Sequence, residues 1–208
     1  VSGGKDSMAL LMSLHGLSRY YPEKFSLEAI SVDLGFGNID FQKIEDFCKK
    51  LSIPFTVVNT QIAQIVFEER KEQHPCSLCA KLRKGAFYSM AKEHGCSKAA
   101  FGHHKDDVIH TMLLSLIFEG RFRSFSPVTY LDKTDITLIR PFLYMEEADI
   151  IGFCRKYQIP VVKNPCPVDG ETKRQYAKEL SSQINRKFPG AKDRMFSAIL
   201  HGIPDYIL

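Results

Sequence analysis

The chain begins with a glycine turn of the kind that binds phosphate. Residues Ser2 to Ser7 read SGGKDS, so two adjacent glycines are followed by a lysine and flanked by two hydroxyls. Glycines allow backbone N–H groups to approach an oxyanion closely, and Lys5 adds a compact positive charge. The common P-loop has a different spacing, with four residues between its first glycine and Gly-Lys-Ser/Thr. We therefore expect a phosphate site of another kind, although a structural turn capped by Asp6 or Ser7 would read similarly.

A second run, GHHKDD from Gly102 to Asp107, places two histidines before two adjacent carboxylates at the start of an expected helix. Asp106 and Asp107 could cap that helix, because carboxylates complement the positive end of its dipole. Near a triphosphate, the same carboxylates could bind Mg²⁺ or act as a general base. The residues alone leave both interpretations open, and the phosphate turn favours the second.

The chain has six cysteines, and three of them stand out from the apolar patterns. Cys76 and Cys79 form a CxxC pair directly before a helix, where the helix dipole would favour a thiolate at Cys79. Cys166 lies in the loop sequence NPCPVDG. A CxxC pair alone can bind zinc, ligate an iron–sulfur cluster or cycle as a dithiol, whereas three thiolates suit a 4Fe-4S cluster that leaves one iron without a protein ligand. Burial in the core is expected for the other three, which are Cys48, Cys96 and Cys154.

Basic residues follow the helix expected after the GHHKDD run, and others fill the tail. Arg121 and Arg123 are interleaved with Phe122 and Phe125, a mixture that can hold phosphates and stack bases or simply form a loop with half-buried rings. The tail contains Arg174 among several lysines and arginines. The formal charge of +4 is compatible with a polyanionic partner without requiring one.

These residues need a scaffold that brings them together, and the chain alternates between strand and helix patterns. Strands are expected over 27–34, 55–59, 97–102 and on both sides of a polar turn at 132–135, with helices between them. This rhythm predicts an α/β fold with a single doubly wound parallel sheet, whose ligands bind at the carboxyl ends of the strands. The SGGKDS turn, Asp33 and the GHHKDD run all follow such strands, so we expect them at one edge.

Length and composition are those of one globular domain over 1–208, with a helical C-terminal extension over 165–208. A turn of this type normally follows a β-strand, yet only Val1 precedes it, so we expect a natural upstream segment to be missing. No apolar run is long enough to span a bilayer and no secretion signal is visible, so we expect a cytoplasmic protein that does not contact membranes.

The ordered set of motifs resembles a known family. The SGGKDS turn resembles the SGGxDS loop of the PP-loop ATP pyrophosphatases, which cleave ATP between the α- and β-phosphates and transfer AMP to a substrate oxygen. Within that family the chain looks like the tRNA 2-thiocytidine synthetase (TtcA-like) branch. The resemblance covers nearly the whole chain, and the motifs that carry it besides the turn are Cys76-Ser77-Leu78-Cys79, GHHKDD, Arg140-Pro141, and Cys166 followed by Arg174.

The resemblance implies a Rossmann-like PP-loop fold, related to the adenine nucleotide alpha hydrolases, and the activity of a tRNA thiolase. Such an enzyme adenylates the 2-oxo group of a cytidine in the anticodon loop, releases pyrophosphate, and inserts sulfur with the help of a 4Fe-4S cluster. The implied cofactors are ATP, Mg²⁺ and this cluster. The implied partners are tRNA and a sulfur donor such as a cysteine desulfurase, and a homodimer is one possible assembly.

Carried over onto this sequence, the resemblance gives each motif an expected role. Catalysis is expected of Lys5 and Asp107, with Asp106 as the second choice. The cluster is expected on Cys76, Cys79 and Cys166. Contacts with tRNA are expected from Arg121, Arg123 and Arg174. The residues expected to bind ATP are Ser2, Gly3, Gly4, Lys5, Asp6, Ser7, Asp33, Gly102 and His103.

The sequence departs from the family pattern in two places. His110 stands where relatives often have glutamate, and the NPCPVDG loop lacks the asparagine- and glutamine-rich surroundings of the proteobacterial enzymes. Two alternatives therefore stay open. One is another PP-loop ligase or thiolase that acts on a different base or on a small molecule, and the other is a nucleotide-binding module whose cysteines hold a structural metal.

Overall fold

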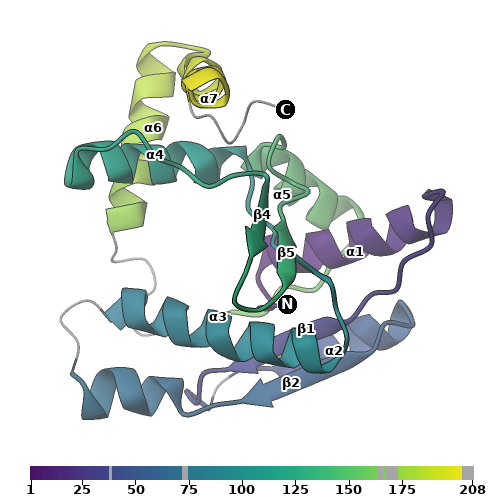
Figure 1. The fold of residues 1–208 in the computed structure, drawn as a ribbon. Helices are drawn as coiled ribbons and strands as arrows, with labels where there is room; N and C mark the ends of the chain where they lie inside the picture. The colour runs from purple at the N-terminus through teal and green to yellow at the C-terminus, as the bar shows by residue number, and fades with distance from the viewer. Residues whose placement is uncertain (38, 72–74, 164–165, 167–172, 203–208) are drawn as a thin grey trace.

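The computed structural model describes residues 1–37, 39–71, 75–163, 166 and 173–202, and strands and helices alternate along most of it (Figure 1). Among the residues described, no helix combines the length and apolar character needed to cross a bilayer. In chain order the elements are α1 (Lys5–Tyr20), β1 (Ala29–Asp33), α2 (Phe41–Lys50), β2 (Phe55–Asn59), η1 (Gln64–Glu69), α3 (Pro75–Glu93), β3 (Lys98–Ala100), α4 (Lys105–Glu119), β4 (Val128–Leu131), β5 (Ile136–Ile139), α5 (Glu147–Lys156), α6 (Lys173–Lys187) and α7 (Ala191–Gly202).

In the described part of the chain the strands form two hydrogen-bonded ladders. β1 pairs with β2 in parallel, from Ala29 opposite Phe55 to Asp33 opposite Asn59. The second ladder has the order β3-β5-β4, in which β3 and β5 are parallel and β4 and β5 form an antiparallel hairpin. The expected α/β fold with parallel strands is confirmed, and so is the hairpin around the polar turn.

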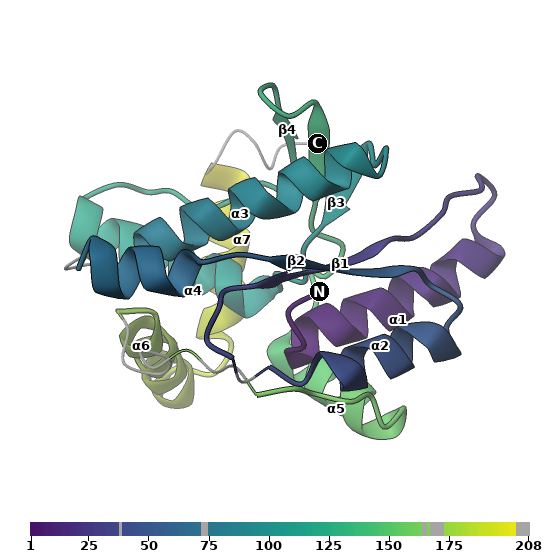
Figure 2. The same ribbon diagram turned by 90° about the horizontal axis from the view of Figure 1, so that it is seen from below.

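Helices cover both faces of the strands, as a doubly wound fold requires. Successive strand residues point to opposite faces, and in β1 Ala29 packs with α1, α2 and α5, whereas Ile30 packs with α3. Figure 2 shows α3 on one side of β1 and β2, with α1, α2 and α5 on the other. Ile30 also shares its cluster with Ala99, Ile136 and Leu138, so one apolar layer joins the two ladders.

The C-terminal helices pack on α4 and form an apolar cluster of their own. Val108 and Ile109 of α4 lie in it together with Ala177 of α6 and Phe196 of α7. A buried polar contact adds to this packing, because His110 Nε2 lies 3.1 Å from Ser181 Oγ. The prediction of a helical tail is confirmed from Lys173 to Gly202, and the rest of 165–208 lies outside the described residues apart from Cys166.

Of the three cysteines expected in the core, two are buried and one is not. Cys48 and Cys154 are buried in the cluster around α1, as expected, whereas Cys96 is only half-buried where the chain turns from α3 into β3. The π-helix η1 was not predicted from the sequence. Its apolar residues form a run too short to show a clear helical period.

The buried imidazole of His110 makes stability depend on pH. Burial lowers its pKa from 6.5 to about 4, although Asp106 and Asp107 act in the opposite direction. Between these values the unfolded chain binds more protons than the folded chain, so stability falls as the pH drops through this window. From pH 7 to pH 5 we expect His110 to account for a loss of about 2 kcal/mol.

Urea unfolding of the wild type and of His110→Gln at both pH values tests this, since glutamine can bond to Ser181 but does not titrate. The variant should show the smaller pH dependence. His201→Gln, at an exposed position of α7, should behave like the wild type. An unchanged pH dependence in His110→Gln would contradict the assignment.

Candidate active site

The glycine turn is packed and hydrogen-bonded into a fixed shape at the N-terminus of α1. Gly3 has a φ of +78°, and a Cβ there would lie 2.9 Å from Val162 Cβ. Val162 N donates to Gly3 O at 2.9 Å. Ser7 Oγ accepts from Ser2 N at 3.1 Å and donates to Gly4 O at 2.9 Å. The turn therefore has the position expected of an anion site, because the free N–H groups of a helix N-terminus favour negative charge.

Lys5 is held beside this turn by two carboxylates. Its Nζ lies 2.7 Å from Asp6 Oδ1 and 3.1 Å from Glu147 Oε1. Burial alone would lower the pKa of Lys5, but the hydrogen bonds and charges of Asp6 and Glu147 outweigh this and raise the pKa. The side chain therefore keeps its charge and a defined direction.

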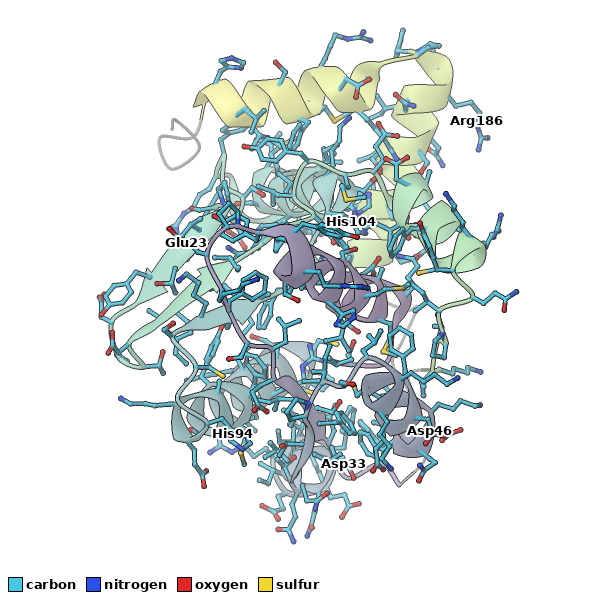
Figure 3. All side chains as sticks on the ribbon, turned by 90° about the vertical axis from the view of Figure 1, so that its right-hand side faces the viewer. Glu23, Asp33, Asp46, His94, His104 and Arg186 are labelled. Carbon is cyan, nitrogen blue, oxygen red and sulfur yellow. The ribbon has the colours of Figure 1, made fainter. Side chains whose placement is uncertain are left out.

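The GHHKDD run packs directly onto the first turn of α1. A Cβ on Gly102 would lie only 2.8 Å from the carbonyl oxygen of Asp6, so the two backbones touch. The buried ring of His104 lies between two carboxylates, with Nε2 3.8 Å from Asp6 Oδ1 and 3.4 Å from Asp107 Oδ2. Motifs far apart in the sequence thus form one site, and Figure 3 shows His104 next to α1.

The adjacent carboxylates have different environments. Asp106 is buried and accepts hydrogen bonds from Glu147 N at 2.9 Å and from Lys192 of α7. Burial would raise its pKa, but Lys192 and the Glu147 N–H bring the pKa below its usual value. Asp107 is more exposed; it caps α4 by accepting from His104 N at 3.1 Å. Asp107 is thus the carboxylate better placed to meet a ligand, whereas Asp106 ties α5 and α7 to α4.

Glu147 is a site residue that was not predicted from the sequence. It lies in the first turn of α5, and its carboxylate contacts Lys5 and, at 3.0 Å, Lys178 of α6. Burial opposes the shift, but these two lysines lower its pKa. A signal was present, because Glu147 starts a helix soon after a strand, as Asp107 does.

Cys76 and Cys79 are the second and fifth residues of α3, so they lie within the helix rather than directly before it, and Cys166 acts on Cys79 from the other half of the chain. Burial and the fields of Cys166 and Cys76 raise the pKa of Cys79, although Arg83 opposes the shift. The expectation that the helix dipole favours a thiolate at Cys79 is therefore wrong for the thiols by themselves.

The thiols nevertheless fit an iron–sulfur cluster by their chemistry. Cysteine sulfur is the usual ligand of such clusters, and a bound metal lowers the thiol pKa. Across the described ranges no three His, Cys, Asp or Glu side chains are arranged closely enough to hold a metal ion. The structure thus brings the three cysteines into one neighbourhood without a finished ligand geometry.

The remaining predicted site residues lie in several places. Asp33 ends β1, where its Oδ1 accepts from Gly35 N at 2.9 Å, and Figure 3 shows it well apart from His104. Arg121 and Arg123 are exposed in the segment between α4 and β4. Arg174 belongs to the site itself, because its Nη1 lies 3.3 Å from Asp107 Oδ1.

Together these groups can stabilise a leaving phosphate. The turn offers backbone N–H groups, Lys5 supplies a fixed positive charge, and Asp6 and Asp107 are two carboxylates close to one another through His104. Mg²⁺ in phosphate sites is usually held by one or two carboxylates together with the phosphates themselves. The geometry is suited to attack on a nucleoside triphosphate with displacement of a phosphate group.

Comparisons with known proteins agree with this geometry. A family model described as a PP-loop domain matches residues 1–181. The tRNA-cytidine(32) 2-sulfurtransferase of Geobacter sulfurreducens is 36% identical over 211 residues, which cover 100% of this chain and 82% of that protein. The protein of the same name from Dechloromonas aromatica is 34% identical over 209 residues, with 100% and 73% covered.

A solved structure has the same fold. The U34-tRNA thiolase NcsA from Methanococcus maripaludis, determined with its 4Fe-4S cluster, superposes with a TM-score of 0.78 over 97% of this chain and 69% of that chain. The sequence identity is 21%, so this similarity establishes the α/β architecture.

The contact between Gly102 and Asp6 can be tested through stability. Gly102→Ala would place a methyl group against backbone atoms that cannot move aside, and we expect it to lower the free energy of unfolding by about 1–3 kcal/mol. Gly152→Ala is the control, because this helical glycine of α5 has open space around its Cα and alanine favours helix by roughly 1 kcal/mol. The free energy of unfolding measured in urea should therefore fall in Gly102→Ala and rise in Gly152→Ala. Equal stability of the two variants would show that the two backbones are not in contact.

Proposed function

Because the chain belongs to the PP-loop family, we propose that it is a tRNA thiolase that uses ATP to replace the 2-oxo group of a cytidine with sulfur. The observation that carries this proposal is the neighbourhood of Cys76, Cys79 and Cys166 in a chain with a formed phosphate turn. A ligase without sulfur chemistry has no need for three such thiols. The sulfurtransferases to which the chain is similar span it completely, which supports the same conclusion.

The first step activates a carbonyl group that is a poor electrophile. The 2-oxo oxygen of the cytidine attacks the α-phosphorus of ATP, the bond between the α-phosphorus and the bridging oxygen breaks, and pyrophosphate leaves. The SGGKDS turn and Lys5 stabilise the charge that grows on the leaving pyrophosphate. Glu147 and Asp6 hold the ammonium of Lys5 in a fixed position.

Metal binding in this step falls to the two more accessible carboxylates. Asp6 and Asp107 would hold Mg²⁺, and the metal would neutralise part of the phosphate charge. Asp106 is the second choice for this role, because it is buried as well as bonded to Glu147 N and Lys192.

The second step exchanges the activated oxygen for sulfur. Hydrosulfide attacks C2, the bond between C2 and the adenylated oxygen breaks, AMP leaves and one proton is released. The thiols of Cys76, Cys79 and Cys166 would hold a 4Fe-4S cluster. When bound, such a cluster supplies an iron position that is free of protein ligands for an incoming sulfur atom.

The partners follow from this reaction. The substrate is tRNA, and the anticodon loop is the expected location of the cytidine. Arg121, Arg123 and Arg174 provide cations for its phosphates. A sulfur donor such as a cysteine desulfurase supplies the sulfide, a tRNA substrate favours the cytoplasm, and a homodimer would be compatible with a larger RNA-binding surface.

Mass spectrometry of tRNA nucleosides tests the function directly. Cluster-loaded protein is incubated with ATP, Mg²⁺, sulfide and tRNA from a strain that lacks the corresponding gene. The proposal predicts a 2-thiocytidine peak that depends on ATP. Protein that releases pyrophosphate and yet leaves every nucleoside unchanged would favour a ligase or a small-molecule thiolase.

Lys5 should be needed for cleavage of ATP. Lys5→Met removes the fixed charge beside the turn, and we expect turnover to fall by about 3 kcal/mol in transition-state stabilisation, roughly 100-fold. Chromatography should show AMP and pyrophosphate as the wild-type products. Lys43→Met, at an exposed lysine of α2, is the matched control and should keep the wild-type rate. ADP as the main product, or a normal rate in Lys5→Met, would contradict the assignment.

Alanine variants of the three clustered cysteines should differ from variants of the other three in iron content and thiolation. Cys76→Ala, Cys79→Ala and Cys166→Ala should each lose iron and thiolation but still bind ATP, because the phosphate turn lies on α1. Cys48→Ala, Cys96→Ala and Cys154→Ala should keep iron and lose only some stability through poorer packing. Iron and acid-labile sulfide are measured in each purified variant. Full iron content and thiolation in Cys166→Ala would overturn the three-cysteine assignment.

A further inference from the structure

Three elements from distant parts of the chain each bring a cation to one region beside α3, the helix that carries Cys76 and Cys79. Lys84 follows Cys79 on α3, Arg140 follows the last residue of β5, and Arg174 lies in the first turn of α6. In Figure 1 the N-terminal end of α6 is the end nearest to α3. Partial burial of its side chain is the main cause of the lowered pKa of Lys84, and within the described ranges the charges of Arg140, Arg83 and Arg174 lower this pKa further.

Arg140 is held rigidly in this group. Its Nη1 donates to Thr129 Oγ1 at 3.2 Å and to the carbonyl oxygen of Ser126, and its Cζ lies 5.0 Å from the centre of the Phe125 ring. A guanidinium with a fixed direction loses little entropy when it binds an anion. Arg174 is also directed, by its contact of 3.3 Å with Asp107.

His103 lies among these cations as a neutral ring. Its centroid is 4.8 Å from that of Phe125, and its Nδ1 is buried with no hydrogen-bond partner in the described part of the chain. Burial, opposed by Asp107 and assisted by Arg140, Arg174 and Lys84, lowers its pKa to about 4. Arg140 and Arg174 thus act on both Lys84 and His103, and Lys84 acts on His103, which places the three cations around one region.

We propose that Lys84, Arg140 and Arg174 form a phosphate subsite that holds a backbone phosphate of the substrate RNA beside the nucleotide to be modified. Like charges held near one another repel, and a phosphate between them removes that repulsion. The inference rests on the proposed function, because it names the part of the RNA that this site would hold.

The location favours RNA over ATP as the source of the phosphate. The ATP phosphates are expected at the turn beside Lys5. Lys5 is not among the charged groups with the largest effect on the pKa of Lys84. Lys84 lies on the helix that carries Cys76 and Cys79, and both Lys84 and Arg174 are exposed, so a macromolecule can reach them. A phosphate bound here would fix the chain next to the thiols that serve sulfur transfer.

Binding measurements on the full-length, cluster-loaded protein test the subsite. The probes are a fluorescently labelled, unmodified tRNA transcript and a non-hydrolysable ATP analogue. Lys84→Met removes the charge and keeps the length of the side chain, Lys84→Arg restores the charge, and Lys92→Met is the control at an exposed lysine of the same helix. Lys84→Met should bind tRNA about 10-fold more weakly, with a salt dependence smaller by about one phosphate contact.

The other expected results are normal tRNA affinity in Lys84→Arg and Lys92→Met, and unchanged affinity of all variants for the ATP analogue. Equal tRNA affinity in Lys84→Met and the wild type would overturn the subsite. Weaker binding of the ATP analogue with unchanged tRNA binding would also overturn it and assign the cations to the nucleotide.

Failure of the subsite can be told from failure of the proposed function in the same series. If the wild type thiolates tRNA and Lys84→Met binds normally, the subsite alone is wrong. If the wild type binds tRNA through Lys84 but changes no nucleoside, the function is wrong and the subsite stands.

Discussion

The backbone of Gly102 lies so close to the carbonyl group of Asp6 that no side chain fits between them, and the site depends on this contact. This contact packs the start of α4 against the start of α1, so the N-termini of the two helices and their acidic residues lie next to each other. His104 is buried between the carboxylates of Asp6 and Asp107 as a consequence. The parallel strands make the contact possible, because they deliver both loops to the same edge of the fold.

Cations from the C-terminal helices balance the acidic charge gathered there. Lys178 of α6 binds Glu147, Lys192 of α7 binds Asp106, and Arg174 of α6 binds Asp107. Each pair joins a surface helix to a carboxylate of the site, so the tail contributes to the shape of the ATP site as well as to the packing of α4. The family match extends into α6, to residue 181, and so includes Arg174 and Lys178.

The sequence predicted the parts of the site that depend on local pattern. Adjacent glycines before a helical period located the phosphate turn, and the strand–helix rhythm placed the GHHKDD run beside it. The position of Glu147 at a helix start was visible in the sequence, but its ion pairs and the different environments of Asp106 and Asp107 were not predictable, because they depend on residues of α6 and α7. The raised pKa of Cys79 was not predictable either, because it depends on burial and on the approach of Cys166 from a distant part of the chain.

The central claim is that ATP activates the oxygen that sulfur replaces. A tRNA carrying oxygen-18 at O2 of the target cytidine tests it most directly, with mass spectrometry of the nucleotide products of a single turnover. The account predicts that the label appears in AMP, because the attacking oxygen stays on the α-phosphorus when the thiolated base is released. Thiolated tRNA together with unlabelled AMP would contradict it.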